Sequence, residues 1–350
     1  MTEDAIRKAL SAVKYPGFSR DIVSFGLVKS IAVENGMAAV GIQIQTRDPQ
    51  VPQRIFKDCH DALDELAGGA GNIQIDIDIQ DPPGAANTPG GVDGKQSIPG
   101  VKRVIAVASG KGGVGKSTVA SNLAVALSKQ GLRVGLCDCD LYGPSIALMF
   151  GVADQQPMAD QQERIIPIEA HGIRLMSMGF LLGDSSPVIV RGPLATRYIQ
   201  QFLQQVSWGN LDVLILDLPP GTGDIQLTIV QTIALDGAVI VTTPQEVALI
   251  DARKAISMFA KVNVRILGLI ENMSWFECNL GTKYHLFGNG GGQREAERMN
   301  IPLLAQIPLD PDTRQRCDEG QPVSLMDGTQ SPIAAAFEQA AAALPAAAGS

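Results

Sequence analysis

Cysteine, histidine and long apolar runs are scarce in this 350-residue sequence, which contains five cysteines and three histidines. So few cysteines, in an odd number, cannot form the dense disulfide framework of a small secreted protein, and they fit a reducing compartment. No stretch approaches the roughly 18 uninterrupted apolar residues of a transmembrane helix. The best candidate, residues 234–250, is broken by Asp236, Pro244 and Glu246. We therefore expect neither a disulfide scaffold nor a membrane-spanning protein.

Positive charge is also in deficit, because 28 lysines and arginines face 36 aspartates and glutamates, which gives a net charge of −8. A chain this acidic has no overall electrostatic attraction to nucleic acid or to acidic lipid. The acidic start at residues 1–4 leads into an amphipathic stretch, which is unlike a secretory signal peptide. We expect a cytoplasmic protein that binds neither nucleic acid nor membranes.

The length and the 45% hydrophobic content suit two buried cores rather than one. Residues 81–100 separate them, since nine of these twenty residues are glycine or proline. A flexible coil of this length spans on the order of 25 Å. We predict a small α/β domain at 1–80, a linker at 81–100, a second domain at 101–345 and a frayed tail at 346–350.

Residues 1–80 carry the patterns of a small α/β unit. Apolar residues recur with helical spacing over 3–13 and 52–66. The dipeptide Asn35-Gly36 lies between two apolar runs and favours a β-hairpin, because both residues tolerate positive φ. Isoleucines alternate with polar residues over 73–79, which predicts a half-buried strand.

From residue 101 onward, short β-branched runs alternate with helical patterns. The predicted strands cover residues 104–108, 133–137, 213–216, 238–242 and 266–270, and the predicted helices cover 118–129, 248–261 and 333–344. Nearly continuous apolar strands separated by helices are typical of a parallel sheet with both faces covered. We therefore predict an α/β fold with a mostly parallel sheet and helices on both faces.

The first of these strands runs into a glycine-rich loop and then a helix, the order that a phosphate-binding loop requires. The loop consists of Gly110, Lys111, Gly112, Gly113, Val114, Gly115, Lys116, Ser117 and Thr118. Glycines let consecutive backbone N–H groups surround phosphate oxygens at the positive end of the helix. Lys116 would neutralise the β- and γ-phosphates of ATP, and the Ser117 hydroxyl would bind Mg²⁺. A glycine-rich connecting turn is the alternative.

Lys111 is a second lysine near the start of the loop. Its ammonium cannot easily reach phosphates that its own loop wraps with backbone, so we expect it to serve a neighbouring chain. Gly-Lys-Gly-Gly-Val-Gly-Lys-Ser-Thr resembles the deviant Walker A motif of the MinD/ParA/nitrogenase-iron-protein class of P-loop NTPases. The resemblance implies a homodimer in which Lys111 enters the partner's ATP site. A solvated surface lysine is the alternative.

Two aspartates end the second predicted strand, and ligands of open α/β sheets bind beyond the carboxyl ends of strands. Asp138 and Asp140 would share one side of an extended chain. Cys137 and Cys139 would then lie on the other side, in the core. By resemblance to the deviant Walker A class, Asp140 matches the carboxylate that orients the attacking water, and Asp138 lies near Mg²⁺. Either aspartate could instead only cap the turn that follows.

Asp217 ends the third predicted strand and precedes a stiff Pro-Pro-Gly turn. This stretch resembles a Walker B motif merged with switch II. The resemblance implies that Asp217 holds Mg²⁺ through water and that the backbone of 221–223 senses the γ-phosphate. Asn272, on the same expected edge, could bind an adenine edge as its counterpart does in related ATPases, or could cap a turn. The catalytic candidates are Lys111, Lys116, Asp140 and Asp217.

Four ordered motifs resemble those of the Mrp/ApbC/Nbp-type iron–sulfur cluster carrier ATPases. They are Asp-Leu-Tyr-Gly-Pro-Ser at 140–145, Arg-Gly-Pro at 191–193, Asp-Leu-Pro-Pro-Gly-Thr-Gly-Asp at 217–224 and Glu-Asn-Met-Ser at 271–274. Residues 1–80 look like the small domain that bacterial members carry ahead of the ATPase. The resemblance implies an ATP-hydrolysing homodimer that holds a [4Fe–4S] cluster and passes it to apoproteins, with iron–sulfur scaffold proteins as further partners.

The sequence departs from the family at the cluster ligands. The family carries Cys-x-x-Cys after Glu-Asn-Met-Ser, whereas only Cys278 is present here, and the stretch that follows is shorter by one residue. Two chains would supply two thiolates, and a cluster usually takes four ligands. The others would come from His285, Cys317, an exogenous thiol or a client protein. A free Cys278 thiol beside a dimer interface is the alternative.

Two other functions stay open. A MinD/ParA-like positioning ATPase would bind membrane or DNA, which favours a basic C-terminal helix or patch. Residues 331–350 contain one glutamate and no lysine or arginine, which argues against the membrane version. The other is a nucleotide switch that assembles partners through residues 1–80 and has lost cluster binding.

Overall fold

The computed structural model describes residues 2–14, 21–24, 26–34, 37–45, 50–67, 73–80, 95–160, 164–180 and 202–344. The chain divides into two compact units, Met1–Gly90 and Gly91–Ser350. The Arg-Gly-Pro motif at 191–193, the predicted tail at 346–350 and residues 81–94 of the predicted linker lie outside the described residues.

The described part of the first unit is a three-stranded sheet with two helices. Its elements are α1 (Glu3–Leu10), β1 (Val28–Glu34), β2 (Met37–Gln45), α2 (Gln50–Ala67) and β3 (Ile73–Gln80). β1 and β2 pair antiparallel around the predicted hairpin, and β2 pairs parallel with β3. Ile42, Leu10 and Leu63 meet in the core, and Ile73, Ile75 and Ile77 of β3 pack against it. The period-two prediction for β3 is thereby confirmed.

Among the described residues of the second unit, nine strands form one sheet in the order β11-β10-β9-β4-β8-β5-β7-β6, with β12 beside β10. They are β4 (Val104–Ser109), β5 (Val134–Asp138), β6 (Ile168–Ala170), β7 (Ile173–Ser177), β8 (Val213–Asp217), β9 (Gly237–Thr242), β10 (Ile266–Glu277), β11 (Lys283–Tyr284) and β12 (Leu303–Leu309). All their pairings are parallel except β6 with β7 and β10 with β11. The predicted mostly parallel sheet is confirmed.

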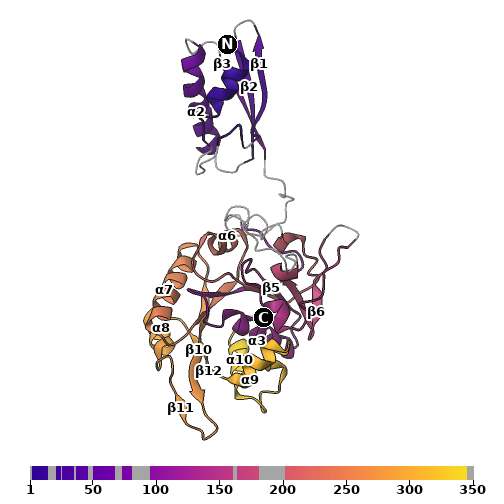
Figure 1. Ribbon diagram of the computed structural model, residues 1–350, viewed down its shortest axis with the longest axis vertical. Coiled ribbons are helices and arrows are strands. Elements are labelled where there is room, and N and C mark those ends of the chain that lie inside the picture. The colour runs from indigo at the N-terminus through magenta and orange to yellow at the C-terminus, as the bar shows by residue number, and fades with distance from the viewer. Residues whose placement is uncertain are drawn as a thin grey trace. The chain divides into compact units, whose positions relative to one another are not determined.

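Helices cover both faces of this sheet (Figure 1). They are α3 (Lys116–Lys129), α4 (Ile146–Met149), α6 (Asp224–Thr232), α7 (Glu246–Lys261), α8 (Gly291–Met299), α9 (Pro311–Asp318) and α10 (Pro332–Ala342), with 3₁₀ turns η2 (Met178–Phe180) and η3 (Val323–Leu325). On central strand β4, Ile105 and Val107 point into the core that contains α3 and α10. Ala106 and Ala108 point into the core that contains α6 and α7. Because both sides of β4 are buried, the strand is apolar from Val104 to Ala108.

Residues 95–100, at the end of the predicted linker, pack on the second unit. Gln96 forms a parallel bridge with Ile233, and Lys95 Nζ donates to the Val262 carbonyl at 2.9 Å. The Ile98 side chain is buried in the core beside α6 and α7. A single apolar residue gives little signal in a stretch rich in glycine and proline, so composition alone did not mark this attachment.

Strand β10 extends seven residues beyond the predicted end at residue 270, to Glu277. Pairing with β12 supports the extension, since Asn272 lies opposite Ile307 and Phe276 opposite Leu309. β10 then turns into β11 and forms a short antiparallel hairpin, in which Phe276 pairs with Tyr284. This hairpin was not predicted, because the strand that supports it, β12, comes from later in the chain.

Candidate functional site

The phosphate loop connects the end of β4 to the start of α3 and lines a cavity of about 230 Å³. The loop residues that line it are Lys111, Gly112, Gly113, Gly115, Lys116, Ser117 and Thr118. Asp140, from the segment after β5, and Pro220, from the loop after β8, face the same cavity. The structure thus brings together the loop and the ends of two neighbouring strands, as the order of elements predicted.

Two predicted loop residues have packing positions instead. Val114 is 2% exposed and belongs to the core beneath α3. Gly110 lies against the backbone of α7, where a Cβ atom would come within 2.1 Å of the Asp251 carbonyl. Only glycine fits this close approach. Val114 therefore anchors the phosphate loop in the core, and Gly110 packs the loop against α7.

Asn272 braces the phosphate loop from β10. Its Nδ2 donates to the Val114 carbonyl at 2.9 Å, and the side chain is buried. Gly115 adopts φ +79° beside it, and a Cβ there would come within 2.2 Å of Asn272 Nδ2. The contact with adenine stays a prediction, whereas the contact with the loop links β10 directly to the phosphate cavity.

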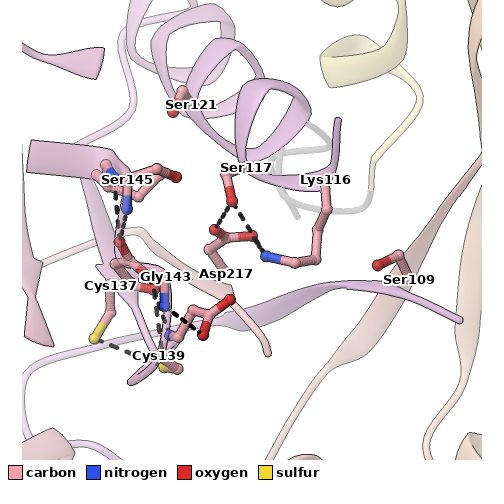
Figure 2. A network of polar contacts seen from close by, with 12 residues as sticks. Ser109, Lys116, Ser117, Ser121, Cys137, Cys139, Gly143, Ser145 and Asp217 are labelled. Atoms are coloured by element: carbon pink, nitrogen blue, oxygen red, sulfur yellow. Dashed lines mark hydrogen bonds and ion pairs between the residues drawn. The ribbon is translucent and has the colours of Figure 1, made fainter. Parts of the chain in front are cut away.

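Lys116 and Ser117, the first two residues of α3, converge on the carboxylate of Asp217 at the end of β8 (Figure 2). Lys116 Nζ lies 2.5 Å from Asp217 Oδ1, and the Ser117 hydroxyl donates to Oδ2 at 2.5 Å. Both partners of the ion pair are buried. Burial raises the pKa of the Asp217 carboxyl, and the Lys116 ammonium opposes that rise by favouring the ionised form.

Asp138 lies beside Asp217, because the two residues are register partners on the adjacent strands β5 and β8. Its Oδ2 accepts from the Ser145 N–H at 2.9 Å, the Ile146 N–H at 3.1 Å and the Ser177 hydroxyl at 3.2 Å. Burial, followed by the charge of Asp217, raises the pKa of Asp138 to about 7. The turn-capping alternative is thus visible in the geometry, and proximity to Mg²⁺ stays a prediction.

Asp140 combines a turn cap with a place in the cavity. Its Oδ1 accepts from the backbone N–H groups of Tyr142 at 3.0 Å and Gly143 at 3.2 Å. These bonds fix the carboxylate where it faces the phosphate loop. Cys137 and Cys139, which alternate with the two acids, are fully buried in the core beside α6 and α7. The predicted core position of both cysteines is confirmed.

Lys111 lines the phosphate cavity at the outer part of the loop and is partly exposed. Its carbonyl accepts from the Ser109 hydroxyl at 2.9 Å, which holds the backbone of the loop. Among the described residues, no carboxylate forms an ion pair with its ammonium. The side chain thus differs sharply from Lys116, whose charge is fully engaged by Asp217.

Cys278 begins the turn of the β10–β11 hairpin. Its backbone N–H donates to the Thr282 carbonyl at 3.0 Å, and its own carbonyl accepts from the Gly281 N–H at 2.8 Å. Hydrogen bonds from the backbone of Leu280 and then Thr282 lower the pKa of the Cys278 thiol. Gly281, three residues after Cys278, has φ +78° and open space around it. The turn therefore presents one cysteine whose ionised form is favoured by these hydrogen bonds.

The other metal-ligand candidates are dispersed. His285 follows β11, on the arm of the hairpin opposite β10, with Nδ1 3.3 Å from the Ser274 carbonyl. Cys317 is buried on α9, and Cys59 is buried in the core of the first unit. Within the described ranges, no group of three His, Cys, Asp or Glu side chains could hold a metal ion. Described residues of one chain therefore do not form a complete cluster site.

Several residues of the site were not predicted as site residues, although Ser145 and Glu271 belong to the motifs Asp-Leu-Tyr-Gly-Pro-Ser and Glu-Asn-Met-Ser. Ser145 and Met149, before and within the short helix α4, line the phosphate cavity. Glu271 is fully buried and accepts from the Gly292 N–H and from Gln306 Nε2, which ties β10 to α8 and β12. A buried carboxylate in an apolar strand is a usable signal, but its partners are 21 and 35 residues away in sequence.

Comparison with known families assigns both units. Residues 100–345 match the family described as the NUBPL iron-transfer P-loop NTPase, and residues 3–75 match the iron–sulfur cluster assembly protein family. The "Iron-sulfur cluster carrier protein" of Deinococcus radiodurans is 45% identical over 323 residues, covering 92% of this chain and 89% of its own. The protein of the same name from Synechocystis is 41% identical over 328 residues, covering 92% and 91%.

Solved structures of nucleotide-binding proteins align with the second unit. A nucleotide-binding protein from Archaeoglobus fulgidus in complex with ADP aligns with TM-score 0.59 and 39% identity, over 67% of this chain and 92% of its own. The septum site-determining protein MinD from Pyrococcus horikoshii, complexed with Mg-ADP, aligns with TM-score 0.54 and 28% identity, over 68% and 94%. Among the described helices, none is long and apolar enough to cross a membrane. The chain belongs to the NUBPL iron-transfer P-loop NTPase family.

Proposed function

We propose that this chain binds ATP with Mg²⁺ and hydrolyses it, and that two copies together carry an iron–sulfur cluster to apoproteins in the cytoplasm. The observation that carries the nucleotide half is the convergence of Lys116 and Ser117 on Asp217 inside the glycine-loop cavity. A cation, a hydroxyl and a carboxylate at that place are the groups that phosphoryl transfer requires. The family assignment supports the cargo half.

The donor set suits Mg²⁺. Ser117 Oγ and the Asp217 carboxylate are hard oxygen donors within 2.5 Å of each other, and Mg²⁺ prefers oxygen ligands and keeps several waters. Asp217 would hold the ion through water and Ser117 directly, with Asp138 as a neighbouring carboxylate. When bound, Mg²⁺ neutralises charge on the phosphates. Lys116 would then turn from Asp217 toward the β- and γ-phosphates.

The remaining residues of the cavity have separate roles in this proposal. The N–H groups of Gly112, Gly113 and Gly115 surround phosphate oxygens, Asp140 orients the attacking water, and Lys111 reaches the ATP of the partner chain. The free ammonium of Lys111, without a carboxylate partner among the described residues, supports that last role. Positioning and charge neutralisation, rather than covalent catalysis, lower the barrier.

The cargo half depends on Cys278. A thiolate is the ligand that iron–sulfur clusters require, and the lowered pKa of this thiol favours that form. Two chains contribute two thiolates, so a [4Fe–4S] cluster needs two further ligands. His285, on the opposite arm of the hairpin, an exogenous thiol or a thiol of the receiving apoprotein would supply them. Cys317, buried on α9, is a poor candidate.

Strand β10 connects the two halves. Asn272 contacts the phosphate loop, and Cys278 follows directly after the end of β10, six residues later along the chain. Between them the register against β12 shifts, and Met273 has φ +56°. A shift of the loop on ATP binding or hydrolysis would therefore move the segment that ends in the cysteine. This connection supports nucleotide-dependent uptake or release of the cargo.

Anaerobic reconstitution with iron and sulfide tests the cargo half. The wild type should acquire the charge-transfer absorbance of iron–thiolate bonds, and Cys278→Ala should lose it. Cys59→Ala, which removes a buried cysteine of the first unit, is the matched control and should behave like the wild type. Equal absorbance in Cys278→Ala and the wild type would exclude Cys278 as a ligand. No absorbance in any of the three would favour the nucleotide switch without a cluster.

A further inference from the structure

Strand β10 is irregular between the phosphate loop and the cysteine hairpin. Asn272 pairs with Ile307 of β12, and Phe276 pairs with Leu309, so β10 takes four steps where β12 takes two. The additional residues form a bulge at 273–275. Bulges bend a strand and are frequent beside functional sites. This bulge lies between the two regions to which the proposed function assigns the nucleotide and the cluster.

Met273, the first residue of the bulge, has a strained backbone. Its φ is +56°, and among the described non-glycine residues only His171, Asn263 and Asn300 also have positive φ. Asparagine and histidine are enriched in this conformation, whereas methionine has no short polar group that could form a compensating local hydrogen bond. Such strain persists only where the surroundings impose it, and it is concentrated at ligand sites and switch regions. The backbone of Met273 would therefore relax if its neighbours released it.

The residue before Met273 is tied to the phosphate loop. Asn272 Nδ2 donates to the Val114 carbonyl at 2.9 Å. That carbonyl and the Gly115 N–H belong to one peptide group, which is planar and rotates as a unit. In the function proposed above, the N–H donates to a phosphate oxygen. A rotation that aims the N–H at the phosphate also moves the carbonyl that Asn272 holds, and Gly115, at φ +79°, is the residue type that permits it.

The residues after Met273 are tied to the hairpin. His285 follows β11, and its Nδ1 lies 3.3 Å from the Ser274 carbonyl. Trp275 is next along the bulge, and the Lys283 ammonium of β11 lies 4.5 Å from the centre of a Trp275 ring. A change of φ at Met273 therefore alters the direction in which Trp275 and the hairpin extend from the phosphate loop.

We propose that Met273 is the hinge of a nucleotide-sensitive switch. A phosphate at the Gly115 N–H rotates the peptide group shared with the Val114 carbonyl, and Asn272 follows that carbonyl. Met273 then leaves its strained conformation, which moves the hairpin. The strain lowers the free energy that nucleotide binding must supply for this change. The inference rests on the nucleotide binding proposed above and names the residue through which that binding reaches the cysteine turn.

Trp275 provides the measurement, because the chain has two tryptophans and the other, Trp208, is buried in the core. Fluorescence of the full chain is recorded with Mg²⁺ and a non-hydrolysable ATP analogue, and calorimetry gives the affinity of the same samples for the analogue. We expect the wild-type emission to change on binding and Trp275→Phe to lose that change. Constant emission in a wild type that binds the analogue, or a change that persists in Trp275→Phe, would overturn the hinge and leave ATP binding intact.

Met273→Gly and Met273→Ala isolate the strain, since both lack the methionine side chain and only glycine adopts positive φ freely. Glycine should favour the resting conformation by about 5- to 30-fold relative to alanine. At the analogue concentration that gives Met273→Ala half of its full signal, Met273→Gly should therefore give less than about half the signal of Met273→Ala. Asn263→Gly, at an exposed residue with φ +55°, is the matched control and should respond like the wild type.

Equal signals in Met273→Gly and Met273→Ala would show that strain at this residue does not set the response, and would overturn the proposal while ATP binding stands. A wild type that binds no nucleotide would overturn the proposed function as well, so the two failures are distinguishable.

Discussion

The phosphate cavity and the cysteine hairpin lie at opposite ends of one segment of β10 and differ in how complete they are. In the cavity, Lys116, Ser117 and Asp217 contact one another, and described residues of a single chain supply cation, hydroxyl and carboxylate. On the hairpin, Cys278 is a single thiol next to Leu280, whose side chain is 90% exposed. In the proposed function, one chain therefore supplies the groups expected to bind the nucleotide, whereas it offers one thiol for the cluster and would need a second chain to add another.

The largest effect is expected from Lys116→Ala. Removal of the ammonium deletes the phosphate contact and leaves Asp217 as a buried, uncompensated carboxylate, which costs about 3–5 kcal/mol of unfolding free energy. Calorimetry should detect no ATP binding, and chemical denaturation should show the loss of stability. Lys102→Ala, which removes an exposed lysine, is the control and should bind ATP like the wild type. If Lys116→Ala bound ATP as tightly as the wild type, the proposal that Lys116 contacts the phosphates would be wrong.

Lys111→Ala should separate binding from turnover. Because we place Lys111 in the partner's site, ATP affinity should fall by no more than about threefold, while kcat should fall by about 100-fold or more, as for other charges supplied in trans. Mixing Lys111→Ala with the hydrolysis-deficient Lys116→Ala should restore part of the activity if sites are shared between chains. A loss of ATP affinity equal to that of Lys116→Ala would contradict the role in trans.

Asn272→Ala should weaken the link between the two regions. The buried Val114 carbonyl would lose its donor, which should lower the unfolding free energy by about 1–3 kcal/mol. ATP should still protect the variant against unfolding but should alter cluster release less than in the wild type. The exposed Asn279→Ala serves as the control. Cluster release that responds to ATP as strongly as in the wild type would show that the link does not run through Asn272.

The smallest effect concerns Asp138. Its pKa of about 7 in the folded chain lies above the ordinary value of 3.8, so the folded state binds the proton more tightly than the unfolded state. Stability from this group is fully present below about pH 4 and is lost as pH rises from about 4 to about 7. Denaturation of Asp138→Asn should lack this decline. A decline equal to that of the wild type would assign it to another group.

In the second unit, the sequence predicted best those features whose residues are neighbours along the chain. Both faces of β4 are buried, so its residues are apolar from Val104 to Ala108, and the glycine loop follows directly along the chain. The contacts that complete the site are not local. Asn272 and Val114 are 158 residues apart, and Lys116 and Asp217 are 101 apart, so no spacing rule joins them.

The assignments of single residues show the same difference between local and long-range contacts. The sequence identified Asp138 and Asp140 as strand-end acids and left turn capping open for both, and the N–H groups of the turn do donate to each carboxylate. The hairpin of β10 and β11 was missed because β12, from later in the chain, supports it.

Sedimentation velocity of the anaerobically reconstituted chain with ATP and Mg²⁺, recorded both at the protein absorbance and at the iron–thiolate absorbance, tests the difference between the two regions most directly. The account predicts that iron–thiolate absorbance sediments only with the dimer, whereas ATP binding is also found in the monomer. Iron–thiolate absorbance that sediments with the monomer would contradict it.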